Sequence, residues 1–86
     1  MIERTVTVVP ENGLHARPAS QLVEAANSHE SQVTIGPADG DSVNASSMLA
    51  VTSLGVETGE EARLTADGPD ESAALDAIES ILTTTE

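Results

Sequence analysis

Residues 60–82 read EEARLTADGPDESAALDAIESIL, and the apolar pattern of this stretch changes its period partway along. From Glu60 to Asp67 apolar residues alternate with polar ones, which predicts a strand buried on one face. Beyond a Gly-Pro turn they recur at helical spacing, which predicts an amphipathic helix that Asp70 opens, with Glu71 as a second acid in its first turn. The apolar positions are Ala62, Leu64 and Ala66 in the strand and Ala74, Leu75, Ile78, Ile81 and Leu82 in the helix.

The same two periods assign the rest of the chain. Strands are predicted at Ile2–Val9, Gln32–Gly36 and Ser42–Ala45, and helices at Ala16–Ser28 and Met48–Leu54. Four amphipathic strands in so short a chain most economically form one antiparallel sheet with three helices on a single face. We therefore expect one domain over residues 1–86, an α/β (α+β) two-layer open-faced sandwich in the order βαββαβα.

The composition narrows the possible partners. The 86 residues include 15 acids, three arginines and no lysine, for a formal net charge of −12. Phosphate backbones and anionic lipid surfaces attract basic patches, so neither nucleic acid nor membrane is an expected partner. A lysine-free acidic surface also suggests a halophilic source, since molar salt screens charges over about 3 Å and weakens self-repulsion. With no aromatic residue, the core has to consist of Val, Ile, Leu, Met and Ala.

Several kinds of site are excluded or disfavoured. With no cysteine there is no disulfide or thiolate metal site, and without lysine there is no P-loop, lipoyl or biotin carrier or Schiff-base enzyme. The run DGDSVN from Asp39 begins like a calcium loop, but Val43 and Asn44 stand where a liganding oxygen and a glycine are needed. We read it as a hairpin turn and expect no metal and no cofactor. The N-terminus does not resemble a signal peptide, and no apolar run approaches about 18 residues, so we expect a cytoplasmic protein.

The stretch ENGLHARPAS at residues 11–20 carries chemically useful groups. His15 is a competent nucleophile for phosphoryl transfer, and Gly13 allows a turn that presents it to solvent. The helix begins either near His15 and Ala16 or at Pro18, and its first N–H groups form an anion site. Arg17 adds a guanidinium that can bind phosphate oxygens. From the residues alone, a surface histidine beside a helix cap explains the pattern as well.

Three further features have both structural and functional interpretations. His29 lies where the first helix ends, and a histidine there interacts favourably with the negative end of the helix dipole. Ser46 and Ser47 are good N-cap residues for the short helix, which a glycine at position 55 can close. Met48 and Leu49 are either core residues or an exposed apolar patch suited to a partner protein.

Three segments together resemble the HPr family, the histidine-containing phosphocarriers of the phosphoenolpyruvate-dependent sugar phosphotransferase system. They are G-L-H-A-R-P-A at 13–19, S-S-M-L-A-V-T-S-L-G at 46–55, and G-x-D-E-x-x-A-L at 68–75 within a strand, turn and helix. They cover nearly the whole chain in the order predicted above, which makes the resemblance specific.

The resemblance implies a role for each segment. His15 would accept phosphate on Nδ1 from phosphorylated enzyme I and pass it to a sugar-specific enzyme IIA component. Arg17 and the helix start, formed by Ala16, Arg17 and Pro18, would bind that phosphate, while Met48, Leu49 and Ser20 would contact partners. The chain would be a monomeric component of the transferase system without a stand-alone activity. Which sugar is served cannot be inferred from the sequence.

The family's regulatory serine aligns with Ser47, after a one-residue insertion in the hairpin at Gly36 to Asp41. The lysine common before it is replaced by Ser46, so a kinase that reads a basic neighbour would not recognise the site, and Ser47 would then act as a helix cap.

Two other classes of protein are alternatives to a phosphocarrier. T-S-L-G-V-E at 52–57 imperfectly matches the attachment motif of acyl carrier proteins, which are helical bundles and lack the strands expected here. A regulatory binding module with the HPr fold but without phosphate transfer would leave a similar pattern in the sequence.

Overall fold

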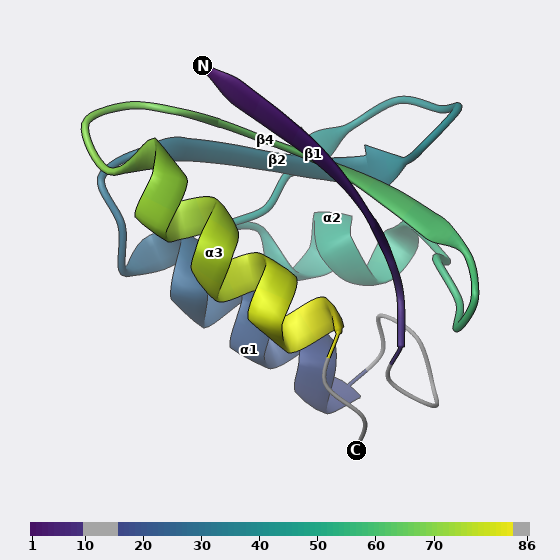
Figure 1. Ribbon diagram of the computed structural model, residues 1–86. Helices are drawn as coiled ribbons and strands as arrows, with labels where there is room; N and C mark the ends of the chain where they lie inside the picture. Colours follow the sequence, from purple (N-terminus) through teal and green to yellow (C-terminus); the bar gives the residue numbers. More distant parts are fainter. Residues whose placement is uncertain (10–15, 84–86) are drawn as a thin grey trace.

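The computed structural model describes residues 1–9 and 16–83, with the backbone alone described at residues 16–18. Its elements follow the predicted order βαββαβα (Figure 1). They are β1 (Ile2–Thr7), α1 (Ala16–Asn27), β2 (Gln32–Pro37), β3 (Val43–Asn44), α2 (Met48–Ser53), β4 (Glu61–Asp67) and α3 (Glu71–Leu82).

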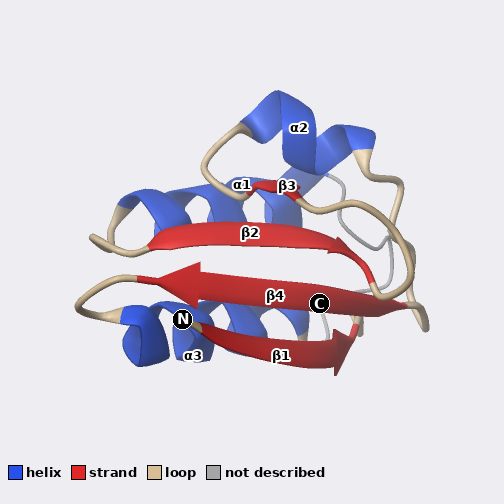
Figure 2. Cartoon of the chain, turned by 90° about the horizontal axis from the view of Figure 1, so that it is seen from above, coloured by secondary structure: helices blue, strands red, loops and turns tan. Residues whose placement is uncertain are grey.

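The strands form one antiparallel sheet in the order β1-β4-β2-β3. β4 lies between β1 and β2, with Arg4 opposite Leu64 on one side and Ile35 opposite Leu64 on the other. Within the described residues, the three helices lie on one face of the sheet and the other face carries no helix (Figures 1 and 2). The predicted two-layer open-faced sandwich is therefore confirmed.

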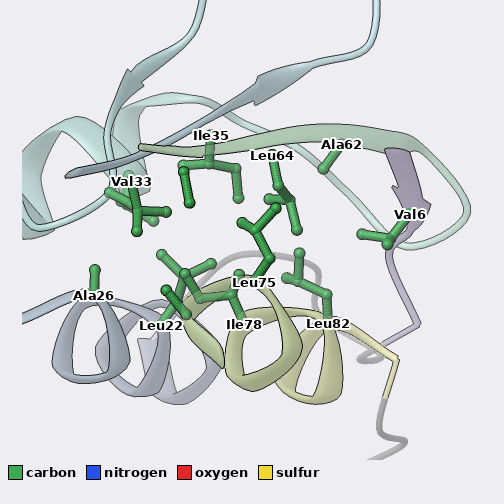
Figure 3. Packing of buried hydrophobic residues seen from close by; sticks show 14 of the residues in the cluster. Val6, Leu22, Ala26, Val33, Ile35, Ala62, Leu64, Leu75, Ile78 and Leu82 are labelled. Carbon is green, nitrogen blue, oxygen red and sulfur yellow. The ribbon is translucent and has the colours of Figure 1, made fainter. Parts of the chain in front are cut away.

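The core lies between the sheet and the helices and is built without aromatic side chains (Figure 3). The inward residues of β2 and β4 meet the predicted apolar stripes of α1 and α3, because alternation in a strand and helical spacing each direct apolar side chains to one side. Fully buried members include Leu22, Ile35, Leu64, Leu75, Ile78 and Leu82. Methionine was wrongly expected in this core, since Met1 and Met48 are 76% and 41% exposed.

Element ends differ by a few residues from the prediction, and tertiary hydrogen bonds explain the larger differences. β1 ends at Thr7 rather than Val9, because the Val9 N–H donates to the Leu82 carbonyl 2.8 Å away and the chain turns from the sheet toward α3. β3 is only Val43–Asn44, because the Asn44 side chain accepts hydrogen bonds from the Ser46 N–H and hydroxyl and turns the chain toward α2.

The start of α3 shows a role for Asp70 that the sequence did not indicate. The helix begins at Glu71, and the Asp70 side chain makes no capping bond to it. Its carboxylate instead accepts hydrogen bonds from the Glu30 N–H (3.0 Å), the Ser31 N–H (2.9 Å) and the Ser31 hydroxyl (2.6 Å). The Ser31 hydroxyl and these N–H groups hold the pKa of Asp70 below its usual value. Asp70 thus connects the loop after α1 to the start of α3.

Candidate functional site

The predicted phosphate-binding segment lies at the start of α1. His15 falls outside the described residues, and Ala16, Arg17 and Pro18 are the first three residues of the helix. Of the two predicted starting points, the structure therefore has the earlier one, at Ala16. The first N–H groups of a helix have no carbonyl partner within it, so the backbone provides donors directly after His15 in the chain.

The core holds α1 in one orientation about its axis. Ala19 and Leu22 are fully buried beneath the sheet, and Ser20 between them in sequence is exposed (Figure 3 shows Leu22). Because the helical period separates neighbouring residues by about 100°, burial of the Ala19 and Leu22 side turns Ser20 to solvent. Ser20 is therefore exposed, and its contact with a partner stays a prediction.

α2 is a short helix with defined ends. Ser47 is its N-cap, and the Ser47 hydroxyl accepts a hydrogen bond from the Ala50 N–H at 3.3 Å. The Ser46 hydroxyl does not cap the helix but donates to Asn44 Oδ1. Beyond the helix Gly55 has a φ of +69°, a conformation that favours glycine and ends the helix as predicted. Of the two candidate serines, Ser47 is therefore the helix cap.

The alternatives for Met48 and Leu49 are resolved by their exposure. Leu49 is 78% exposed and Met48 is 41% exposed, whereas Val51 is fully buried. A helix of six residues buries one side only, and in α2 that side is at Val51. Met48 and Leu49 are therefore surface residues.

Two hydroxyl residues of α2 that the sequence did not single out also shape this surface. Thr52 Oγ1 donates to the Met48 carbonyl at 2.9 Å, and Ser53 Oγ donates to the Leu49 carbonyl at 2.7 Å. Ser and Thr commonly bond back to the carbonyl four residues earlier, so their positions relative to a helix start are the signal that would have found them. The bonds satisfy both hydroxyls within α2.

α1 and α2 pack against each other, which places the helix start and the exposed apolar residues on adjoining elements (Figure 2). The Asn27 side chain at the end of α1 donates to the Val23 carbonyl at 3.0 Å and reaches the Ser46 carbonyl at 3.5 Å. These contacts connect α1 to the segment that leads into α2.

The two arginines whose side chains are described are engaged elsewhere. Arg4 Nη1 lies 2.6 Å from Asp76 Oδ1 and 3.1 Å from Glu79 Oε1, and chiefly the Asp76 hydrogen bond raises the pKa of Arg4. Arg63 Nη2 donates to the Gly40 carbonyl at 3.0 Å and thereby holds the turn between β2 and β3. Neither guanidinium reaches α1 or α2 through these bonds.

The remaining predicted features have structural explanations. His29 Nδ1 lies 2.7 Å from the Ala25 carbonyl, at the end of α1 as expected. The DGDSVN run from Asp39 lies in the hairpin predicted for it: its first four residues connect β2 to β3, and Val43 and Asn44 form β3. Within residues 1–9 and 16–83 no group of three or more His, Asp or Glu side chains is arranged to hold a metal ion. No helix in this described part is long and apolar enough to cross a membrane.

The sheet also excludes the acyl carrier alternative, because carriers of that class are helical bundles and this chain forms four paired strands. The T-S-L-G-V-E match at 52–57 instead covers the end of α2 and the loop after it.

Comparisons with known proteins agree with this fold. A family model described as the PTS HPr component phosphorylation site matches residues 2–84. A phosphocarrier protein HPr from Haloferax volcanii is 62% identical over 99% of this chain and 97% of its own. One from Streptomyces coelicolor is 49% identical over 95% of this chain and 88% of its own. The crystal structure of the Bacillus anthracis phosphocarrier HPr has a TM-score of 0.90 at 35% identity, covering 95% of this chain and 96% of that one.

The relative from Haloferax also agrees with the halophilic character predicted from the acidic surface. The family model spans the predicted histidine motif, both helices of the candidate site and the strand, turn and helix at the C-terminal end. The chain therefore belongs to the HPr family, the phosphocarriers of the sugar phosphotransferase system.

Proposed function

We propose that His15 carries the phosphoryl group, accepting it from phosphorylated enzyme I and donating it to a sugar-specific enzyme IIA component. The observation that carries this proposal is the G-L-H-A-R-P-A motif at 13–19, within a family match named for its phosphorylation site, whose residues 16–19 form the start of α1. The lone pair of unprotonated Nδ1 attacks phosphorus, the N–P bond forms, and the bond between phosphorus and the donor breaks. Transfer to the IIA component repeats these events with His15 as the leaving group.

The start of α1 would stabilise the transferred group. Ala16 and Arg17 supply backbone N–H groups without intrahelical partners, and these favour negative charge through hydrogen bonding and the helix dipole. Pro18 has no N–H to contribute, but its restricted φ suits the first turn of a helix. The Arg17 guanidinium would add charge-assisted bonds to the phosphate oxygens. Phosphate transfer then needs no metal and no cofactor in this chain.

The carrier role also determines how the protein meets its partners. A group passed between two different proteins must lie at a surface that both can reach, and the exposed Ser20, Met48 and Leu49 lie on the helices next to the proposed site. We place the protein in the cytoplasm as a single-domain monomer. Regulatory phosphorylation of Ser47 would require a kinase that accepts Ser46 before it and would act on a hydroxyl that caps α2.

The test is phosphorylation by cognate enzyme I and phosphoenolpyruvate, followed by intact mass and acid treatment. The wild-type protein should gain one phosphoryl group that acid removes, because phosphohistidine is acid-labile. His15→Ala should gain none. His29→Ala is the matched control and should gain the group normally, since the His29 ring is at the opposite end of α1.

No mass gain in the wild-type protein with a competent enzyme I would refute the proposal and favour a regulatory binding module. If the acid-labile mass gain persists in His15→Ala and disappears in His29→Ala, the phosphoryl group is on His29, which would also refute the proposal.

A further inference from the structure

Backbone hydrogen bonds from two distant segments hold Val8 and Val9, the residues that follow β1. The Val8 N–H donates to the Glu60 carbonyl at 2.9 Å, and the Val8 carbonyl accepts from the Gly59 N–H at 2.8 Å. The Val9 N–H donates to the Leu82 carbonyl at 2.8 Å. The chain after β1 is therefore held both by the turn that precedes β4 and by the end of α3.

The turn at residues 57–60 is closed on itself. The Glu60 N–H donates to the Glu57 carbonyl at 3.0 Å, and Glu60 Oε1 accepts from the Glu57 N–H at 2.8 Å. Gly59 has a φ of +89°, a conformation that residues with a Cβ rarely adopt. The bond from the turn to Val8 therefore depends on a backbone conformation that glycine provides.

The side chains beside these bonds are buried in the core. Val8 is 1% exposed, Val56 before the turn is 3% exposed and Leu82 is fully buried. α1 and α3 pack against each other, and the end of β1, the end of α3 and the start of α1 lie at the same end of the molecule (Figures 1 and 2). Val9 and Ala16, which flank residues 10–15, are therefore both held by elements of one core.

We infer that Gly59 is a positioning residue for His15, because its turn fixes the point from which the chain enters residues 10–15. The inference rests on the proposed function, which makes His15 the phosphoryl acceptor. A connection of six residues between two fixed ends has few conformations, so a shift at one end changes how the chain approaches the other. Misplacement of a reacting group by about 1 Å can cost about 100-fold in rate.

The first test is the proton NMR spectrum of the unphosphorylated protein in D2O. The chain has no Phe, Tyr or Trp, so the imidazole protons of its two histidines give its only aromatic ring signals. Gly59→Ala should move the His15 signals and leave the His29 signals in place, because alanine does not suit a φ of +89° and the turn shifts. Gly68→Ala is the matched control. Its Cβ would lie 2.6 Å from Ser31 Cα, so it should move the His29 signals and leave those of His15.

The second test is the rate of phosphoryl transfer, with each variant as the substrate of cognate enzyme I. Gly59→Ala should lower kcat about tenfold or more and change KM less than about threefold, because the exposed residues proposed to contact partners are unchanged. Gly59→Asn should recover kcat to within about threefold of the wild type, since asparagine tolerates positive φ. Gly68→Ala should stay within about twofold of the wild type, because it acts at the other end of β4.

Circular dichroism and the melting temperature check that each variant folds. If Gly59→Ala does not fold, Glu60→Ala takes its place, because it removes the acceptor of the Glu57 N–H by truncating an exposed side chain. It should move the His15 signals and lower kcat about threefold. Glu60→Gln, which keeps an acceptor oxygen, should stay within about twofold of the wild type.

Unmoved His15 signals in Gly59→Ala, or a kcat within about twofold of the wild type, overturn the inference. A Gly68→Ala variant that moves the His15 signals and lowers kcat as much as Gly59→Ala overturns it as well, because loss of stability then explains both. Failure of the proposed function is recognised separately: there enzyme I leaves the wild-type protein unphosphorylated, and the proton spectra still decide whether Gly59 positions His15.

Discussion

Replacement of Leu22 by alanine tests whether the core sets the position of α1. Leu22 is fully buried and lies beneath the sheet near Ile78 of α3 (Figure 3). The change removes apolar carbons worth about 2.4 kcal/mol of transfer free energy, at about 0.8 kcal/mol for each of roughly three groups. A cavity that closes only in part raises the expected loss of unfolding free energy to about 3–4 kcal/mol. That is a large share of the roughly 4–13 kcal/mol expected for a domain of this length.

The assay is urea unfolding followed by far-ultraviolet circular dichroism, since the chain has no tryptophan or tyrosine to report by fluorescence. Gln21→Ala is the control on the same helix, because Gln21 is exposed and should change the free energy of unfolding by no more than about 0.5 kcal/mol. A loss below about 1 kcal/mol for Leu22→Ala, with an unchanged m-value, would refute the reasoning that this contact anchors α1.

Three further outcomes are expected. The melting temperature should rise as KCl is raised from about 0.1 M to about 2 M, because screening relieves repulsion among the carboxylates, and a fall would contradict a halophilic chain. Asp70→Asn should lower the urea midpoint most at neutral pH, because folding lowers the pKa of Asp70. The stabilisation by the Asp70 carboxylate is therefore present above its ordinary pKa of 3.8 and is lost as the pH falls through the lower pKa of the folded state. A difference between the two proteins that persists undiminished toward about pH 2 would contradict this assignment. Gly68→Ala should cost about 1–3 kcal/mol in urea unfolding, because the added Cβ would lie 2.6 Å from Ser31 Cα, and an unchanged midpoint would show that the loop yields freely.

The elements of this fold could be predicted because each follows from a local period. β4 alternates Ala62, Leu64 and Ala66, and all three are fully buried in the structure. The helical stripe that follows places Leu75 and Ile78 in the same core. Alternation buries one face of a strand and helical spacing buries one side of a helix, so the layers follow from the pattern without knowledge of any contact.

The ends of the elements could not be predicted in the same way, because bonds to residues distant in sequence determine them. β1 ends near the point where the Val9 N–H donates to the Leu82 carbonyl. The Asp70 carboxylate accepts hydrogen bonds from the Glu30 and Ser31 N–H groups instead of capping α3. Asp before a helix normally indicates a cap, and that local preference was overridden by a loop some forty residues away in sequence.

Some residues of the candidate site could be predicted from the sequence, and others were decided only by packing. The motif at 13–19 is a property of the sequence, and it identifies His15 and Arg17 as the proposed phosphate-binding pair without any coordinates. The sequence could not decide whether Met48 and Leu49 are core or surface, since an apolar pair at the start of a short helix is compatible with both. Packing decided it, because Val51 occupies the buried side of α2 and only one side of so short a helix is covered.

The sequence by itself determined the fold class, the family and the residues proposed for phosphate transfer, because periodicity, composition and motifs do not depend on tertiary contacts. Only the tertiary structure decided which serine caps α2, what Asp70 bonds to, and that Met48 and Leu49 are exposed on α2. These outcomes depend on which distant segments the sheet and core bring within a few ångströms of each other, and no local pattern carries that information.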